Sequence, residues 1–236
     1  MKVAIHQPHY LPWLGYLAKW AAADVFIFLD TVQYEKNGWQ NRNRIKTRRG
    51  PAWLTVPVHA PFGTRLDAVT IDTRQPWRRR HLAALEHAYA GAPAFDRYRA
   101  ELATLWQTEW SHLAPLNVTS ARWLAQAFGI TTPSYLASEM DVTDTDPAGR
   151  LVGLCRAVGG DTYLAGRDGV VYMDLDRFRQ AGIGIRVQRY THPVYPQPHG
   201  DFAPFLSGVD LLLTHGDQGR RILEQGDAWS DNLSGD

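Results

Sequence analysis

The N-terminal segment, residues 1–29, constrains the fold more than any other part of the chain. Lys2–Ile5 is typical of a short strand, residues 14–23 of a helix that begins after Pro12, and Val25–Leu29 of a fully buried strand. A strand, a helix and a buried strand in this order favour a parallel pair joined by a crossover. Because strands and helices go on alternating along the chain, we predict an α/β fold with a Rossmann-like parallel sheet core.

Residues 75–130 interrupt this alternation. Their apolar residues recur at helical spacing, and Gly91 and Pro115 separate three predicted helices. We expect these helices to form an insertion within a single α/β domain that covers residues 1–236, a length that can bury a substantial core. A frayed tail is expected over residues 226–236.

Charge and cysteine content narrow the class of function. Lys and Arg total 25 and Asp and Glu total 24, so the formal net charge is +1. A charge near zero excludes a general binder of nucleic acid but allows a local basic stripe. The single cysteine, Cys155, excludes an internal disulfide, and in its apolar helix we expect it to be a core residue. No segment resembles a signal peptide or a membrane span, so we expect a cytoplasmic protein without a membrane or nucleic-acid partner.

The most informative motif follows the first predicted strand. His6 comes directly after that strand, and Pro8 and Pro12 stiffen the loop that it begins. Because ligands in open parallel sheets bind beyond the carboxyl ends of strands, we predict that His6 is a general acid or base. The side chains that we expect to bind substrate here are Gln7, Tyr10, Trp13, Tyr16 and Lys19. The alternative is a packed N-terminal corner in which these rings are core.

His6 and His9 also form a His-x-x-His pair between a strand and a helix. Nucleotidyltransferases carry such a pair to bind ATP phosphates at a helix N-terminus. No glycine-rich phosphate loop accompanies the pair in this sequence. Adenylyl transfer therefore stands as a third hypothesis, behind the two given below.

A carboxylate and a basic stripe follow the second predicted strand. Asp30 ends that strand, and beside His6 it would orient the imidazole as in a catalytic dyad. Residues 41–48 then place a cation at every second position, which in an extended strand puts the cations on one face. Such a face suits phosphate or carboxylate groups, although a charged, solvated edge strand is the alternative. The residues that we expect to bind an anionic donor are Gln33, Trp39, Asn41, Arg42, Arg44 and Lys46.

Near the C-terminus lies a second stiff loop, residues 190–202, rich in proline and aromatic residues. Because it follows a predicted strand, we expect it to lie over the first loop. We assign His192 as a further acid or base, and Tyr195 and Asp201 as substrate-binding residues. No compact set of metal ligands occurs in the sequence, so we predict no metal.

These motifs resemble those of the WbqC-like protein family, and the resemblance spans essentially the whole chain. The segment Tyr163-Leu164-Ala165-Gly166 is similar to the family's Tyr-Leu-Ser-Gly, with Ala165 in place of the serine. The other residues that carry the resemblance are His6-Gln7-Pro8, Tyr10, Pro12-Trp13, Gly15-Tyr16, Lys19, Ala23-Asp24-Val25-Phe26, Leu29-Asp30, Val32-Gln33-Tyr34, Trp39, Asn41-Arg42, Arg44-Ile45-Lys46, Gly50, residues 53–58, residues 191–197, Leu206-Ser207 and Asp210-Leu211-Leu212.

The resemblance implies a place in bacterial surface-polysaccharide (O-antigen) or natural-product biosynthesis, with a transferase role that attaches an acyl or aminoacyl group to an amine. Our leading hypothesis is therefore transfer from a thioester or phosphate-bearing donor to the amine of a sugar or small metabolite. No cofactor is required, because the donor itself (a nucleotide, coenzyme A or a phosphopantetheine arm on an acyl or peptidyl carrier protein) is activated. The second hypothesis is a non-catalytic module that binds a nucleotide sugar or a carrier protein.

Overall fold

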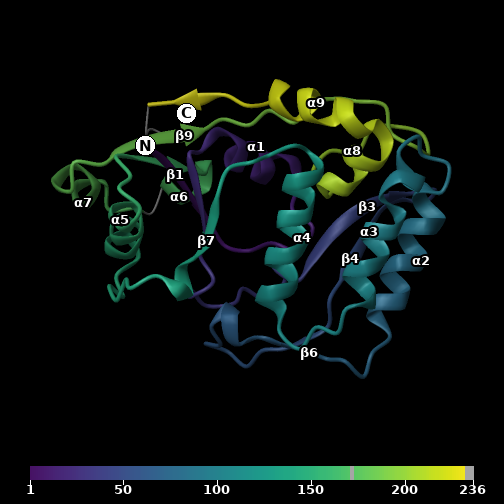
Figure 1. Ribbon diagram of the computed structural model, residues 1–236, viewed down its shortest axis with the longest axis horizontal. Helices are drawn as coiled ribbons and strands as arrows, with labels where there is room; N and C mark the ends of the chain where they lie inside the picture. The colour runs from purple at the N-terminus through teal and green to yellow at the C-terminus, as the bar shows by residue number, and fades with distance from the viewer. Residues whose placement is uncertain (171–172, 232–236) are drawn as a thin grey trace.

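A six-stranded, mostly parallel sheet forms one end of the molecule in the computed structural model, which describes residues 1–170 and 173–231 (Figure 1). The strand order is β10-β9-β8-β1-β2-β7, and only β10 runs antiparallel to its neighbour. The strands are β1 (Lys2–His6), β2 (Val25–Phe28), β7 (Ser134–Leu136), β8 (Thr162–Ala165), β9 (Gly184–Gln188) and β10 (Trp229–Ser230). The predicted α/β class with a parallel sheet is confirmed.

The N-terminal segment folds as its pattern predicts. Helix α1 (Leu14–Ala22) connects β1 to β2, and the two strands pair in parallel with His6 opposite Phe28. Every residue of β2 is buried, in keeping with its continuous apolar run. Later in the chain, β8 pairs with the other side of β1. The strand order thus reverses at β1: β2 and β7 lie on one side of it, and β8 and β9 on the other. Open parallel sheets bind ligands at such a switch point.

Two hydrophobic cores lie on the two faces of this sheet. Alternate side chains of β1 separate them, because Val3 and Ile5 join one core and Ala4 the other. The smaller core contains the fully buried Cys155, as expected, and Phe178. The helices on its side are α5 (Pro147–Ala157) and α7 (Leu175–Gln180).

The larger core extends from α1 into the other end of the molecule. A hairpin and three helices complete it, with Ile45, Leu85 and Leu116 among the buried side chains. The prediction of three helices in residues 75–130 is confirmed, and they share this core with α1. The elements are β3 (Arg42–Thr47), β4 (Gly50–Thr55), α2 (Trp77–Tyr89), α3 (Phe95–Gln107) and α4 (Leu113–Ala127).

The remaining elements are short, and two of them differ from the sequence prediction. The strand expected at residues 53–58 is divided into β4 and β5, because Pro57 lies between them and has no N–H to donate. In the expected tail, Trp229–Ser230 pair with β9, whereas residues 232–236 lie outside the described residues. These elements are β5 (Val58–His59), β6 (Thr70–Ile71), α6 (Arg167–Val170), α8 (Gly208–His215), α9 (Gly219–Gln225) and the 3-10 helices η1 (Leu66–Ala68), η2 (Ala137–Glu139) and η3 (Gly216–Gln218).

Among the described residues, every helix is too short or too polar to cross a membrane.

Candidate functional site at the carboxyl end of β1

Four side chains at the carboxyl end of β1 form a group that we name the His–Lys cluster: His6, His9, Tyr16 and Lys19. The imidazole centroid of His6 lies 4.6 Å from that of His9 and 4.5 Å from the Tyr16 ring centroid. Lys19 reaches the group from α1, and its Nζ donates to the carbonyl oxygen of Ile5 at 3.3 Å. The other three members are buried, whereas His6 is partly exposed. His6 is therefore the member that a substrate can reach.

The loop between β1 and α1 is fixed through its backbone. Asn43 on β3 donates to the carbonyl oxygen of Leu11 at 2.7 Å, and Asn117 on α4 donates to that of Pro8 at 2.9 Å. The Ser120 hydroxyl accepts from the Leu11 N–H at 3.2 Å. These bonds hold Leu11 at φ 44, a left-handed conformation that a branched residue avoids. His6 is consequently mounted on a rigid loop.

Sequence reasoning missed the three residues that fix this loop. Asn117 and Ser120 lie inside a helix whose apolar pattern is ordinary, and Asn43 alternates with the cations of the basic stripe. All three are almost fully buried. Their chain spacing gives no sign of the distant backbone that they bind. For Asn117 and Ser120, the one available signal was a polar residue on an otherwise apolar helix face, because a buried polar side chain needs a hydrogen-bond partner.

Burial gives the His–Lys cluster unusual protonation states. Burial, and then the charge of Lys19, lowers the pKa of His9 to about 3. Burial also lowers the pKa of Lys19 to about 7. For His6, burial and the charges of Lys19 and His9 hold the pKa well below 6.5. The two imidazoles are therefore neutral at pH 7, and Lys19 is close to its midpoint.

The tautomer of His6 follows from its hydrogen bond. Nδ1 of His6 lies 3.1 Å from the carbonyl oxygen of Gln7, which can only accept, so Nδ1 carries the proton and Nε2 keeps its lone pair. Asp30 was predicted to do this orienting, but it bonds elsewhere. Its two oxygens accept from the backbone N–H and the hydroxyl of Ser138, at 2.9 and 2.6 Å. The backbone carbonyl oxygen of Gln7, rather than Asp30, therefore orients the imidazole of His6.

Two predicted substrate-binding residues have structural roles instead. Tyr10 is 1% exposed, and its hydroxyl accepts from Trp106 Nε1 at 3.0 Å and contacts His81 Nδ1 at 2.9 Å. The other ring nitrogen of His81 contacts the carbonyl oxygen of Thr55 at 3.1 Å. Asn41 is also buried and donates to a backbone carbonyl oxygen of the neighbouring strand segment. Neither side chain is exposed to a ligand.

The cations of β3 alternate as predicted and share one side of the hairpin. We name this surface the Arg–Trp face: Trp39, Arg42, Arg44 and Trp53. The Arg42 guanidinium lies 4.3 Å above the Trp53 ring, and that of Arg44 lies 5.6 Å from Trp53 and 5.8 Å from Trp39. Within the described chain, neither arginine forms a salt bridge. This face is therefore cationic and uncompensated.

A hydrogen bond joins the Arg–Trp face to the loop of His6. Gln40, which follows Trp39, donates from Nε2 to Oε1 of Gln7 at 2.7 Å. Gln7 in turn follows His6 in the sequence. Gln33, also predicted to bind substrate, lies at the surface in a bridge with Arg65. Gln7 is thus joined to the hairpin that carries the basic stripe, whereas Gln33 pairs with a different segment of the chain.

The C-terminal loop packs beside this face. Nδ1 of His192 lies 2.9 Å from the carbonyl oxygen of Pro193, and its buried Nε2 has no hydrogen-bond partner. The ring of His192 lies 5.5 Å from that of Phe205, which is 5.7 Å from the Trp13 ring. Trp13 is held there because its indole covers Gly15, where a Cβ would lie 2.3 Å from the ring. Trp13 and His192 thus both lie next to the exposed ring of Phe205.

Two other predicted residues, Tyr195 and Lys46, are buried beneath this loop, whereas the side chain of Asp201 is exposed. The hydroxyl of Tyr195 donates to Asp210 at 2.9 Å, and Tyr89 donates to the other carboxylate oxygen at 2.7 Å. Burial raises the pKa of Asp210, and these hydroxyls and the charge of Lys46 oppose that rise. The ammonium group of Lys46 donates to the backbone carbonyl oxygen of Asp201. Lys46 therefore ties the hairpin to the loop, and it is buried and turned away from solvent.

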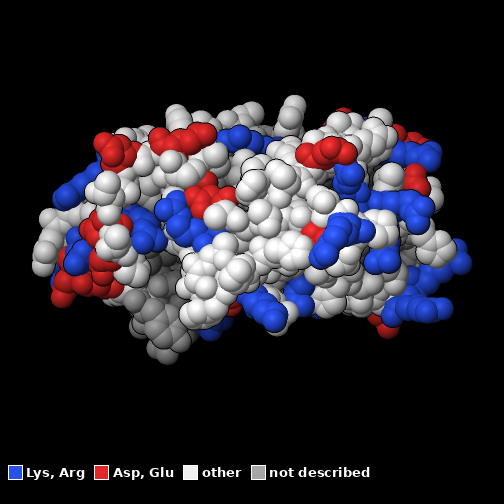
Figure 2. Space-filling model, turned by 90° about the horizontal axis from the view of Figure 1, so that it is seen from below, with Lys and Arg blue, Asp and Glu red and all other residues white. Residues whose placement is uncertain are grey.

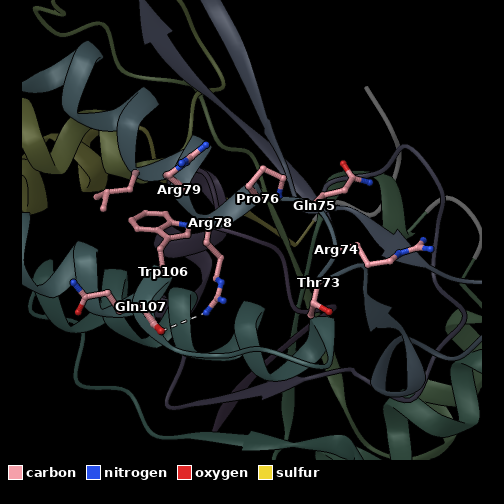
Figure 3. Close-up of a pocket in the computed structure, with 9 residues that line it drawn as sticks. Thr73, Arg74, Gln75, Pro76, Arg78, Arg79, Trp106 and Gln107 are labelled. Carbon is pink, nitrogen blue, oxygen red and sulfur yellow. Dashed lines mark hydrogen bonds between the residues drawn. The ribbon is translucent and has the colours of Figure 1, made fainter.

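A cavity of about 530 Å³ at the start of α2 is separate from this site (Figure 3). Arg74, Arg78 and Arg79 line it, but two of them have structural partners. Arg78 donates to the carbonyl oxygens of Gln107 and Thr108 at the end of α3, and Arg74 is paired with Asp72. Figure 2 shows Lys and Arg side chains gathered at the α2–α3 end of the surface, and mixed charges at the α5–α7 end. Arg78 therefore stabilises the C-terminal end of α3, and Arg74 a turn before α2.

Within the described residues, no three His, Cys, Asp or Glu side chains converge as a metal site would require. The arrangement is a neutral imidazole with a free Nε2 beside a cationic aromatic surface. It can accept a proton at one point and hold an anionic group at another.

Comparison with known proteins agrees with the resemblance of the motifs. A Mycobacterium tuberculosis protein described as "Uncharacterized protein Rv1507c" is 34% identical over 220 residues, which cover 91% of this chain and 94% of that protein. No solved structure matches the chain. The model of the WbqC-like protein family matches residues 7–222, which begin one residue after His6 and include the other members of the His–Lys cluster and the other site residues. The chain is a member of the WbqC-like protein family.

Proposed function

We propose that this chain is a biosynthetic transferase that moves an acyl or aminoacyl group from an activated, anionic donor to an amine. The observation that carries the proposal is the state of His6. Its Nδ1–H is bound to the Gln7 carbonyl oxygen, its pKa is held well below 6.5, and it is partly exposed at the end of the central strand. A neutral imidazole with a free Nε2 is the form that a general base requires.

The reaction that fits is the formation of an amide. The neutral amine attacks the carbonyl carbon of the thioester, a C–N bond forms, and the C–S bond breaks. Nε2 of His6 accepts the proton that the amine nitrogen loses, and the thiolate leaves with the electron pair of the C–S bond. The imidazolium then returns its proton to the thiolate. Lys19, near its midpoint at pH 7, adds positive charge near the reacting centre.

The biological setting and the finer fold assignment belong to the same proposal. The strand order read from β7 to β10 follows the 3-2-1-4-5-6 pattern of doubly wound sheets, which supports a Rossmann-like core with residues 75–130 as a helical insertion. We place the enzyme in the cytoplasm, in bacterial surface-polysaccharide or natural-product biosynthesis. A nucleotide sugar or small amine would be the acceptor, and coenzyme A or a carrier protein would bear the donor.

Adenylyl transfer is supported less well. It would use both His6 and His9 to contact phosphate, but His9 is 8% exposed and burial lowers its pKa to about 3. A neutral, enclosed imidazole is poorly placed to bind an anion. The binding-module hypothesis would use the same surface without chemistry, so turnover separates it from the transferase.

The test measures thiol release that depends on an amine. Acyl and aminoacyl thioesters of coenzyme A and of phosphopantetheine are mixed with amino sugars and nucleotide-linked amino sugars, and the amide is identified by mass spectrometry. His6→Ala and His6→Gln are expected to lower the rate at least a hundredfold. His87→Ala, a change of an exposed histidine on α2, is the matched control. Release that is unaffected by the His6 variants would remove the proposed base.

A further inference from the structure

The Arg–Trp face and the neighbouring Phe205 have features that the transfer chemistry does not explain. Trp53 and Phe205 are each 46% exposed, although most aromatic side chains in the described residues are buried. Exposed rings beside uncompensated cations are typical of surfaces that stack on a planar, charged ligand. The His–Lys cluster performs its proposed proton transfer without them.

The position of Phe205 is held at a conformational cost. Its φ is 58, in the left-handed region that bulky residues avoid. Arg44 fixes this conformation, because its Nη2 donates to the carbonyl oxygens of Phe205 at 3.3 Å and Pro204 at 3.4 Å. The same guanidinium lies against the rings of Trp53 and Trp39. One arginine therefore aligns an exposed ring of the C-terminal loop with the indoles of the hairpin.

The two arginines of this face retain unused hydrogen-bonding capacity. The Nε atoms of Arg42 and Arg44 are buried and have no partner. Arg42 uses Nη2 to donate to the carbonyl oxygen of Asn37, so its charge is not neutralised. Unpaired guanidinium N–H groups without a carboxylate are suited to an oxyanion such as a phosphate.

The face also adjoins the His6 site on two sides. On one side, Gln40 beside Trp39 binds Gln7 beside His6. On the other, the ring of Phe205 contacts Trp13, which precedes the helix that carries Tyr16 and Lys19. A ligand held on the face can therefore extend toward the partly exposed His6.

We propose that the Arg–Trp face and Phe205 bind the nucleoside phosphate portion of the donor. The base stacks on the exposed Trp53 and Phe205 rings, and its phosphates bind Arg42 and Arg44. This inference rests on the proposed function, and it favours a donor with a nucleoside, such as a coenzyme A thioester, over a bare phosphopantetheine arm. The arm carries one phosphate and no ring, so it would leave the aromatic surface unused. A polynucleotide is disfavoured, because the formal net charge is only +1.

The test measures binding without turnover. Calorimetry compares ADP, UDP and inorganic pyrophosphate on the intact chain. ADP is expected to bind at least tenfold more tightly than pyrophosphate, because only ADP can stack. Trp53→Ala should weaken ADP binding about tenfold and leave pyrophosphate binding unchanged, and Trp53→Phe should restore most of the loss. Arg42→Gln and Arg44→Gln should each weaken both ligands, because they contact phosphate.

Phe62→Ala is the matched control, because Phe62 is 99% exposed and does not belong to the Arg–Trp face, so the change should have no effect on either ligand. ADP binding that is no tighter than pyrophosphate binding, or that is unchanged in Trp53→Ala, would overturn the inference. If amine-dependent thiol release then occurs equally from coenzyme A and phosphopantetheine thioesters, the transfer proposal survives alone. If ADP stacks as expected but no thioester reacts, the nucleoside site survives and the transfer proposal fails.

Discussion

Asp30 and Ser138 join the carboxyl ends of two neighbouring strands. One oxygen of Asp30 accepts the Ser138 backbone N–H at 2.9 Å, and the other accepts its hydroxyl at 2.6 Å. Asp30 is 3% exposed, and Asp30→Ala removes both hydrogen bonds to its carboxylate, so the free energy of unfolding should fall by about 1–3 kcal/mol. Urea denaturation measures the change, with the exposed Asp141→Ala as control. A large loss of transfer rate at full stability would instead return Asp30 to the catalytic role.

The pKa values of the cluster can be measured directly. Histidine Cε1–H resonances, assigned with His6→Gln and His9→Gln, are followed by NMR from pH 8 to pH 5. His9 should not titrate in this range, and the His6 midpoint should lie below 6.5. Lys19→Met should raise the His6 midpoint, because the charge of Lys19 is one of the causes that lower it. A His6 midpoint that is unchanged in Lys19→Met would contradict the electrostatic interaction between Lys19 and His6.

Lys19 also makes stability depend on pH. Its pKa falls from 10.5 in the unfolded chain to about 7 in the folded protein, so between these values the unfolded state binds more protons. The free energy of unfolding should therefore rise with pH from about 7 to about 10, by up to about 1.4 kcal/mol per pH unit from this group. Denaturant titrations at several pH values should show a steeper rise in the wild type than in Lys19→Met. Equal slopes would mean that Lys19 stays charged.

Asn117 should be important for both stability and site geometry. It is fully buried and donates to the carbonyl oxygens of Pro8 and Gln40 at 2.9 and 2.7 Å. Asn117→Ala should cost about 1–3 kcal/mol of unfolding free energy and speed hydrogen exchange in the loop after β1. Gln126→Ala, an exposed position on the same helix, provides the comparison. Unchanged exchange in that loop would show that other contacts suffice to hold it.

Tyr10 was expected to touch substrate, and its surroundings lead to a different prediction. Tyr10→Phe removes the hydroxyl that contacts both Trp106 and His81, so the free energy of unfolding should fall by about 1–3 kcal/mol. The KM for the donor should stay unchanged, because the ring is buried. A raised KM with unchanged unfolding would restore the substrate role.

The sequence was informative where one local pattern decides the structure. The apolar run of β2 and the alternation in β3 each specify a buried face, so the parallel sheet and the position of Arg42 and Arg44 were predictable. The position of His6 at the end of β1, where it is partly exposed, was also predictable. These features depend on residues close together in the chain.

What the sequence could not specify depends on distant partners. Asp30 and His6 lie at neighbouring strand ends, but the choice between His6 and Ser138 as partner depends on where β7 brings residue 138. Tyr10 looks like a loop aromatic, and only the packing of α2 and α3 shows that its hydroxyl is enclosed. The position of a residue at a strand end predicts that it lies near the other strand ends. Which of these residues form hydrogen bonds with one another depends on tertiary packing.

The hydrogen bonds that hold the loop after β1 have a consequence for folding during synthesis. The backbone N–H of Leu11 donates to the hydroxyl of Ser120, which lies 109 positions later in the chain. During synthesis the ribosome releases this loop early, but Asn117 and Ser120, which bind its backbone, emerge only with α4. A nascent chain halted before that helix would contain β1 and β2 but would lack these hydrogen bonds to the loop. The loop that carries His6 would thus reach its final conformation only after Ser120, about halfway along the 236 residues, has been translated.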